Sequence, residues 1–224
     1  MDKKKYIVIT GASSGLGECL SKSFSKSYDV INISRTISSN VHNIISNFSD
    51  LKDLKQKLKT KNPIHELCIL NAGTMGEIKF ASDVTDNDFL ETLKINIVAN
   101  KIIMDWSILN GCKNFIGISS GAAKKNYDGW LNYCVSKSAF RSMFLQYQKD
   151  LPKLRFKLIS PGILKTEMNK KIKAQDISLY PEMKKFHETI ASPPQKASEL
   201  IYKKYSDYLK SEKLEIDLRD EAEW

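Results

Sequence analysis

Short apolar runs rich in β-branched residues alternate with longer helical patterns along the whole chain, and this alternation limits the possible folds more than any other feature. It is typical of βαβ units, in which parallel strands form a sheet that helices cover. We predict an α/β fold with a doubly wound, mostly parallel sheet and helices on both faces. Strands are expected at residues 5–10, 29–34, 66–70, 114–119 and 155–160, with weaker candidates at 42–46 and 214–218.

The helical patterns lie at residues 16–27, 51–59, 87–109, 131–149 and 195–210. No repeat, low-complexity tract or Pro/Gly/Ser-rich linker divides the sequence. A chain of 224 residues with 42% hydrophobic residues can bury one substantial core. We therefore expect one domain over residues 1–224.

The charge balance, 35 Lys+Arg against 26 Asp+Glu for a net charge of +9, raises the question of an anionic partner. The lysines are dispersed, mixed with acids and not interleaved with aromatic residues. We therefore predict neither nucleic-acid nor membrane binding. The apolar run before Gly11 is too short for a signal-peptide core or a membrane span.

The cysteines and histidines give no sign of a metal site. Cys19, Cys68, Cys112 and Cys134 show no C-x-x-C spacing, and the three histidines have no neighbours at ligand spacing. A disulfide framework is likewise not indicated, so we expect a reducing, cytoplasmic location.

A glycine-rich turn separates the first expected strand from the first helix, with the sequence Thr-Gly-Ala-Ser-Ser-Gly-Leu-Gly over residues 10–17. Gly11 permits the tight turn, Gly15 lets backbone N–H groups approach a pyrophosphate, and Gly17 lets the helix pack on the sheet. The turn therefore predicts a dinucleotide site, whose loop also includes Ser13, Ser14 and Leu16.

This T-G-x-x-x-G-x-G turn resembles the fingerprint of the short-chain dehydrogenases/reductases, which implies a Rossmann fold and a nicotinamide cofactor. Further motifs extend the resemblance over essentially the whole chain. They are Asn71-Ala72-Gly73 beside the adenine half of the cofactor, Asn96, Pro161-Gly162 with Ile163, and Thr166 at the carboxamide.

The end of the second strand favours NADPH over NADH. Ser34 stands where an NAD enzyme would carry an acid for the ribose hydroxyls, and Arg35 follows it. The Arg35 guanidinium can pair with a 2′-phosphate, with Ser34 and Thr36 as neutral neighbours. Asn47-Phe48 departs from the acidic and aliphatic pair that many relatives place beside the adenine.

The candidate catalytic residues follow the fifth expected strand. Ser120 comes directly after it, and Tyr133 lies thirteen residues further on, four residues before Lys137. On a helix this spacing puts Tyr133 and Lys137 on one face, where the ammonium can sit near the phenol and lower its pKa. Ser119 is the alternative to Ser120, although the spacing favours Ser120.

By resemblance to the family, Tyr133 gives a proton to the alkoxide that forms as hydride reaches a carbonyl carbon, and Ser120 stabilises the oxygen. Lys137 binds the nicotinamide ribose, and Asn96 holds a water that links Lys137 to solvent. A bare Y-x-x-x-K is common on exposed helices. Its position between the glycine turn and Pro161-Gly162 is what indicates a catalytic pair.

The segment between Ser120 and Tyr133 is similar to that of the sepiapterin reductase and benzil reductase branch, which reduces one carbonyl of vicinal dicarbonyls. Tyr127 and Trp130 are candidates for a flat apolar substrate wall, and a structural role for Trp130 is equally consistent with the sequence. Met168, Met183 and Phe186 lie where relatives carry a substrate lid, and ordinary helix packing explains each equally well.

Three other functions remain open. A 3-ketoacyl-thioester reductase is the nearest rival, because its acyl-carrier-protein partner is acidic and would suit the net charge of +9 of this chain. A non-catalytic NADPH sensor or scaffold would have no need of Tyr133, and a nucleic-acid role ranks last. The resemblance also implies a homodimer or homotetramer formed through the helices that contain Asn96 and Tyr133.

Overall fold

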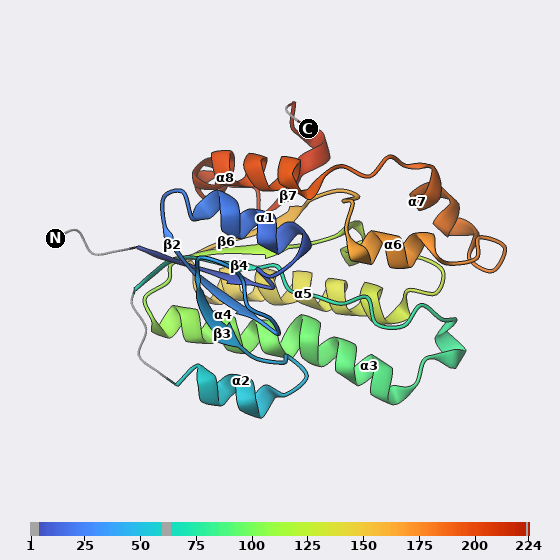
Figure 1. The fold of residues 1–224 in the computed structure, drawn as a ribbon, viewed down its shortest axis with the longest axis horizontal. Helices are drawn as coiled ribbons and strands as arrows, with labels where there is room; N and C mark the ends of the chain where they lie inside the picture. The colour runs from blue at the N-terminus through green and yellow to red at the C-terminus, as the bar shows by residue number, and fades with distance from the viewer. Residues whose placement is uncertain (1–4, 60–63, 223) are drawn as a thin grey trace.

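The computed structural model describes residues 5–59, 64–222 and 224, and its seven strands form one sheet (Figure 1). The order is β3-β2-β1-β4-β5-β6-β7, and all six neighbouring pairs are parallel. The strands are β1 Tyr6–Thr10, β2 Asp29–Ser34, β3 His42–Ile45, β4 His65–Leu70, β5 Asn114–Ile118, β6 Arg155–Ser160 and β7 Glu215–Asp217. The predicted doubly wound sheet is confirmed, and both weaker candidates are its edge strands.

Helices cover both faces of the sheet because each presents an apolar stripe to it. On one face pack α1 Gly15–Phe24 and α8 Pro194–Lys210, and on the other α2 Leu51–Lys57, α4 Ala99–Leu109 and α5 Leu131–Asp150. Phe24 of α1 and Phe144 of α5 are fully buried on opposite faces. None of the helices in the described residues is long and apolar enough to cross a membrane.

The helix expected at residues 87–109 is interrupted. The chain forms α3 Asp86–Leu93, a π-helical turn at Lys94–Val98 and then α4. The π turn widens the helix by one residue, which a pattern of apolar residues does not reveal. Asn96 lies inside this turn and is buried.

An excursion of the chain at residues 165–191 lies beyond the carboxyl end of β6 and carries α6 Glu167–Lys173, the 3₁₀ turn η4 Pro181–Met183 and α7 Lys184–Glu188. The two ends of the excursion meet where Leu164 forms a β-bridge with Ser192. Three further 3₁₀ turns are η1 Ala81–Asp83, η3 Gly121–Ala123 and η5 Leu218–Asp220.

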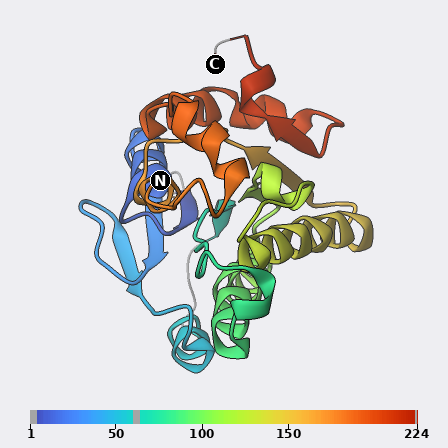
Figure 2. The same cartoon turned by 90° about the vertical axis from the view of Figure 1, so that its right-hand side faces the viewer.

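Figure 2 views the molecule toward the carboxyl ends of the strands, with the α6–α7 excursion in front of them. The connections of the sheet reverse direction between β1 and β4, and open α/β sheets bind ligands at such a point. The fold therefore places the loops after β1, β2, β4, β5 and β6 around one site.

Candidate active site

A cleft of about 1260 Å³ runs along these loops. Single small-molecule sites usually measure about 300–1,000 Å³, so the cleft has room for a dinucleotide together with a substrate. Of the predicted cofactor and substrate residues, all but Gly17 line it. They are Gly11, Ser13, Ser14, Gly15, Leu16, Ser34, Arg35, Thr36, Asn47, Phe48, Asn71, Ala72, Gly73, Ser120, Tyr127, Trp130, Tyr133, Lys137, Pro161, Gly162, Ile163 and Thr166.

The glycine turn after β1 has the backbone that its sequence predicts. Gly11 and Gly15 have φ of +70° and +56°, a region that residues with side chains rarely occupy. A Cβ atom on Gly17 would lie 2.1 Å from the carbonyl oxygen of Gly11. Gly17 therefore supports the turn from below, while Gly11 and Gly15 expose backbone to the cleft.

Two buried side chains lock the neighbouring loops to this turn. The Thr10 hydroxyl accepts hydrogen bonds from the backbone N–H groups of Asn71 and Ala72, each at 2.9 Å. The Asn32 carboxamide oxygen accepts from the N–H of Ala12 at 3.1 Å. The ends of β1, β2 and β4 are thus held together where a dinucleotide would lie.

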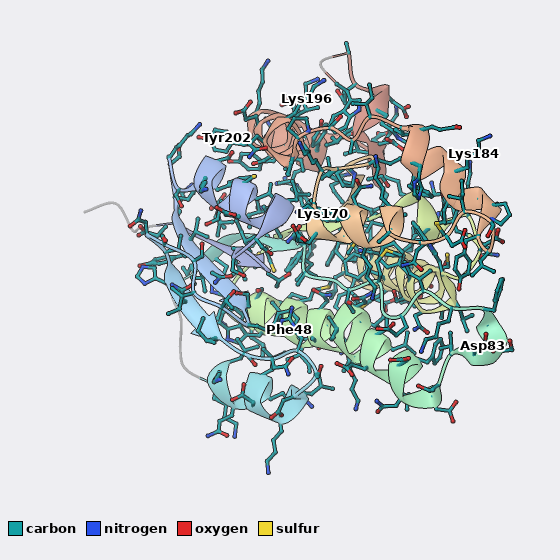
Figure 3. All side chains as sticks on the ribbon, turned by 45° about the vertical axis from the view of Figure 1, so that its right-hand side comes forward. Phe48, Asp83, Lys170, Lys184, Lys196 and Tyr202 are labelled. Carbon is teal, nitrogen blue, oxygen red and sulfur yellow. The ribbon has the colours of Figure 1, made fainter. Side chains whose placement is uncertain are left out.

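The loop after β2 offers a cation and no acid. Arg35 is exposed on the cleft and makes no ion pair within residues 5–59, 64–222 and 224. Ser34 is buried and donates to the carbonyl of Thr36 at 2.6 Å. Phe48, only 5% exposed, presents an apolar surface nearby on the α2 side of the sheet, as Figure 3 shows.

Ser120, Tyr133 and Lys137 come together at the carboxyl end of β5. The Lys137 ammonium donates to the carbonyl of Ile118 at 2.8 Å and lies 5.6 Å from the centre of the Tyr133 ring. Ser120 is the N-cap of η3, where its hydroxyl accepts from the N–H of Ala122 at 3.2 Å. The four-residue spacing on α5 thus places the phenol and the ammonium side by side, as predicted.

Burial controls the protonation of both groups. It raises the pKa of Tyr133 to about 12, while a hydrogen bond with Ser120 acts in the opposite direction. It lowers the pKa of Lys137 from 10.5 to about 8. We expected Lys137 to lower the pKa of Tyr133, but burial is the largest influence on the phenol and raises its pKa, so the phenol stays protonated at neutral pH and can donate.

Asn96 lies behind this group and does not line the cleft. Its carboxamide donates to the Thr74 carbonyl and the Ser136 hydroxyl and accepts from the Thr74 N–H, each at 2.8 Å. The side chain is therefore fully engaged with protein groups. Its predicted link to a water beside Lys137 stays a prediction.

An aromatic wall flanks Tyr133. The Trp130 ring lies 5.7 Å from that of Tyr133, 4.9 Å from Tyr127 and 5.0 Å from Phe186 of the excursion. Trp130 is 3% exposed, so it packs the loop and also closes the cleft. Of the three residues that we assigned to a lid or to packing, Met168 and Phe186 line the cleft, whereas Met183 is fully buried and does not.

Sequence reasoning missed the contribution of the C-terminal segment. Arg219 and Trp224 line the cleft, and a Cβ on Gly162 would approach the Trp224 ring to 3.1 Å. No motif marks these residues. Only the pairing of β7 with β6 brings them to the site.

The doubly wound sheet, the glycine turn and the tyrosine–lysine pair beside it define a dinucleotide-binding oxidoreductase. Residues 5–177 match the family described as short chain dehydrogenase, and the chain belongs to that family.

Two relatives and one solved structure illustrate the similarity. A benzil reductase ((S)-benzoin forming) from Bacillus cereus is 30% identical over 75% of the chain and 79% of that protein. A 3-oxoacyl-[acyl-carrier-protein] reductase from Rickettsia prowazekii is 28% identical over 75% of the chain and 76% of its own length. The closed form of serine dehydrogenase complexed with NADP+ superposes with a TM-score of 0.79 at 20% identity, covering 95% of this chain and 93% of that one.

Proposed function

We propose that this protein is an NADPH-dependent carbonyl reductase that reduces one carbonyl of a vicinal dicarbonyl compound to an alcohol. The observation that carries the proposal is the convergence of Ser120, Tyr133 and Lys137 on one cleft with the glycine turn and Arg35. When bound, NADPH would supply the hydride for the carbonyl carbon.

The residues of the chain would supply the proton and the orientation. The hydroxyls of Ser120 and Tyr133 donate hydrogen bonds to the carbonyl oxygen, which holds it where negative charge develops. The buried, protonated phenol of Tyr133 then transfers its proton to that oxygen. Lys137 would bind the nicotinamide ribose, from a position that its bond to Ile118 fixes.

The cofactor residues fit a phosphorylated dinucleotide. Gly11 and Gly15 expose backbone N–H groups beside the positive end of α1, which attracts a pyrophosphate. Arg35 follows β2 without an acidic neighbour on the cleft surface of that loop. A bidentate guanidinium at that position favours the 2′-phosphate of NADPH over the free hydroxyl of NADH.

Two observations support a dicarbonyl substrate. The B. cereus relative acts on benzil by its description, and an aromatic wall of Tyr127, Trp130 and Phe186 borders Tyr133 here. The similarity to the R. prowazekii reductase favours a 3-ketoacyl thioester as the second candidate.

The test is oxidation of NADPH, compared with NADH, in the presence of benzil, 1-phenyl-1,2-propanedione, sepiapterin and acetoacetyl thioester. We expect turnover of a dicarbonyl with NADPH, and in Tyr133→Phe a fall of about 10²- to 10⁴-fold in kcat/KM with NADPH binding retained. A preference for the thioester would assign the second candidate instead. NADPH binding without reduction of any compound would reduce the proposal to a cofactor sensor.

A further inference from the structure

The mouth of the cleft carries an ammonium group in a built position. Lys185 of α7 places its nitrogen 3.9 Å from the centre of the Tyr127 ring, a cation–π contact. Lys185 lines the cleft, and neither it nor the neighbouring cleft residue Lys125 has a carboxylate partner among the described residues.

The position of Lys185 is fixed by contacts between the excursion and the loop after β5. The carboxylate of Glu182 accepts a hydrogen bond from the Asp128 N–H at 3.0 Å. The Phe186 ring is buried and lies 5.0 Å from Trp130 and 5.6 Å from Tyr127. The ammonium therefore stands over an ordered aromatic wall.

Within the described residues, no carboxylate of the cleft lining forms an ion pair with Lys185. The four carboxylate residues on its lining each have a partner: Glu77 with Lys171 at 3.6 Å, Asp88 with Lys79 at 3.8 Å, Glu91 with the Ser49 hydroxyl at 3.1 Å and Glu167 with Lys170 at 2.6 Å. The positive charge of Lys185 is thus available to a ligand.

Lys185 belongs to the substrate end of the cleft. It stands on Tyr127, which follows β5, whereas Arg35 follows β2, and β1 and β4 lie between those strands in the sheet. Rings lead from Tyr133 through Trp130 to Tyr127, with centroid distances of 5.7 and 4.9 Å. Along this path the rings of Trp130 and Tyr127 stand between the ammonium and Tyr133, so Lys185 lies at a distance from the reacting centre, not beside it.

We propose that the substrate is an aromatic ketone with an anionic group on the side of the ring opposite the reacting carbonyl, and that Lys185 binds this anion. The aromatic body would pack on Trp130 and Phe186 while the carbonyl reaches Ser120 and Tyr133. The inference rests on the proposed function and narrows its substrate class.

The experiment compares 1-(4-carboxyphenyl)-1,2-propanedione with its methyl ester as substrates of the wild-type enzyme, Lys185→Met and Lys184→Met. Lys184, which Figure 3 labels on α7, is one residue away, pairs with Glu188 and does not line the cleft, so it is a control for the loss of charge alone. Lys185→Glu provides a reversal of charge.

We expect Lys185→Met to lower the acid-to-ester ratio of kcat/KM about fivefold, the upper range for an accessible ion pair. Lys185→Glu should lower it further and Lys184→Met should leave it unchanged. High ionic strength, about 1 M, should reduce the wild-type preference for the acid, because salt screens exposed charges. In Lys185→Met the KM for the acid should rise, while kcat stays nearly constant.

An unchanged ratio in Lys185→Met, or an equal fall in Lys184→Met, would overturn the inference while leaving carbonyl reduction intact. If the wild-type enzyme reduces neither compound nor benzil, the proposed function fails. Calorimetric titration of the carboxylate into enzyme loaded with NADP+ then decides the inference separately, since equal affinity for the wild type and Lys185→Met would refute it.

Discussion

Replacing Lys137 by methionine should stabilise the cofactor-free protein at neutral pH while abolishing most of its activity. Lys137 is 6% exposed, and burial lowers its pKa from 10.5 to about 8. Each pKa unit corresponds to about 1.4 kcal/mol, so holding this ammonium in the folded state costs about 3 kcal/mol. Methionine has a similar length and carries no charge.

The net gain is smaller because the ammonium also makes a hydrogen bond. It donates to the Ile118 carbonyl at 2.8 Å, and losing a hydrogen bond from a charged group costs about 2 kcal/mol. We therefore expect Lys137→Met to be more stable by about 1 kcal/mol, which for a chain of this size raises Tm by about 2–4 °C.

The stability difference between Lys137→Met and the wild type should depend on pH. Between the folded pKa of about 8 and the unfolded value of 10.5, the unfolded chain binds more protons at Lys137, so wild-type stability gains with rising pH. The advantage of Lys137→Met is therefore complete below about pH 7 and closes as the pH rises from 8 toward 10.5.

Urea and thermal denaturation without cofactor, at about pH 7 and pH 9.5, measure both quantities. Lys149→Met on the exposed part of the same helix is the control, with an expected change within about 0.5 kcal/mol. A Lys137→Met protein that is less stable than the wild type at pH 7, or a gap that is the same at both pH values, would refute the reasoning.

Three further substitutions test the cofactor half of the cleft. Arg35→Ala should raise KM for NADPH about 10- to 100-fold and leave KM for NADH within about twofold, since only the 2′-phosphate loses a bidentate partner. Equal losses for both cofactors in steady-state kinetics would contradict that role. Gly17→Ala should destabilise the fold by more than about 3 kcal/mol in urea, because its Cβ would lie 2.1 Å from a Gly11 backbone atom, and near-normal stability would be inconsistent with this geometry. Thr10→Val should cost about 1–3 kcal/mol by removing the acceptor of two partly buried N–H groups, while Thr10→Ser should restore most of it, and equal stability of the two variants would disprove the account.

The sequence was most informative where one local pattern determines one local structure. Short apolar runs, with an alternating pattern for the last one, predicted all seven strands, with ends within one residue of those observed. The four-residue spacing of Tyr133 and Lys137 predicted that both side chains face the same way on α5, because the helical period fixes it.

Other features depend on packing between distant segments and leave no local pattern. The helices α6 and α7 have seven and five residues and depend on tertiary contacts such as those of Met183, which is fully buried. Arg219 and Trp224 reach the cleft only because β7 pairs with β6. Lys185 is one of two adjacent lysines in the sequence, and nothing local distinguishes it from Lys184; its contact with Tyr127 exists only in the folded chain.

The π turn at Lys94–Val98 explains how a residue outside the cleft can still influence it. The turn holds Asn96 where its carboxamide joins the backbone of Thr74, after β4, to the hydroxyl of Ser136 on α5. Ser136 directly precedes Lys137, so the bond from Asn96 ties the part of α5 that carries the ammonium to the π turn. A regular α-helix would rotate Asn96 by about 100° relative to the residues that follow and separate these contacts. The irregular turn is therefore the feature that lets Asn96 reach both neighbours.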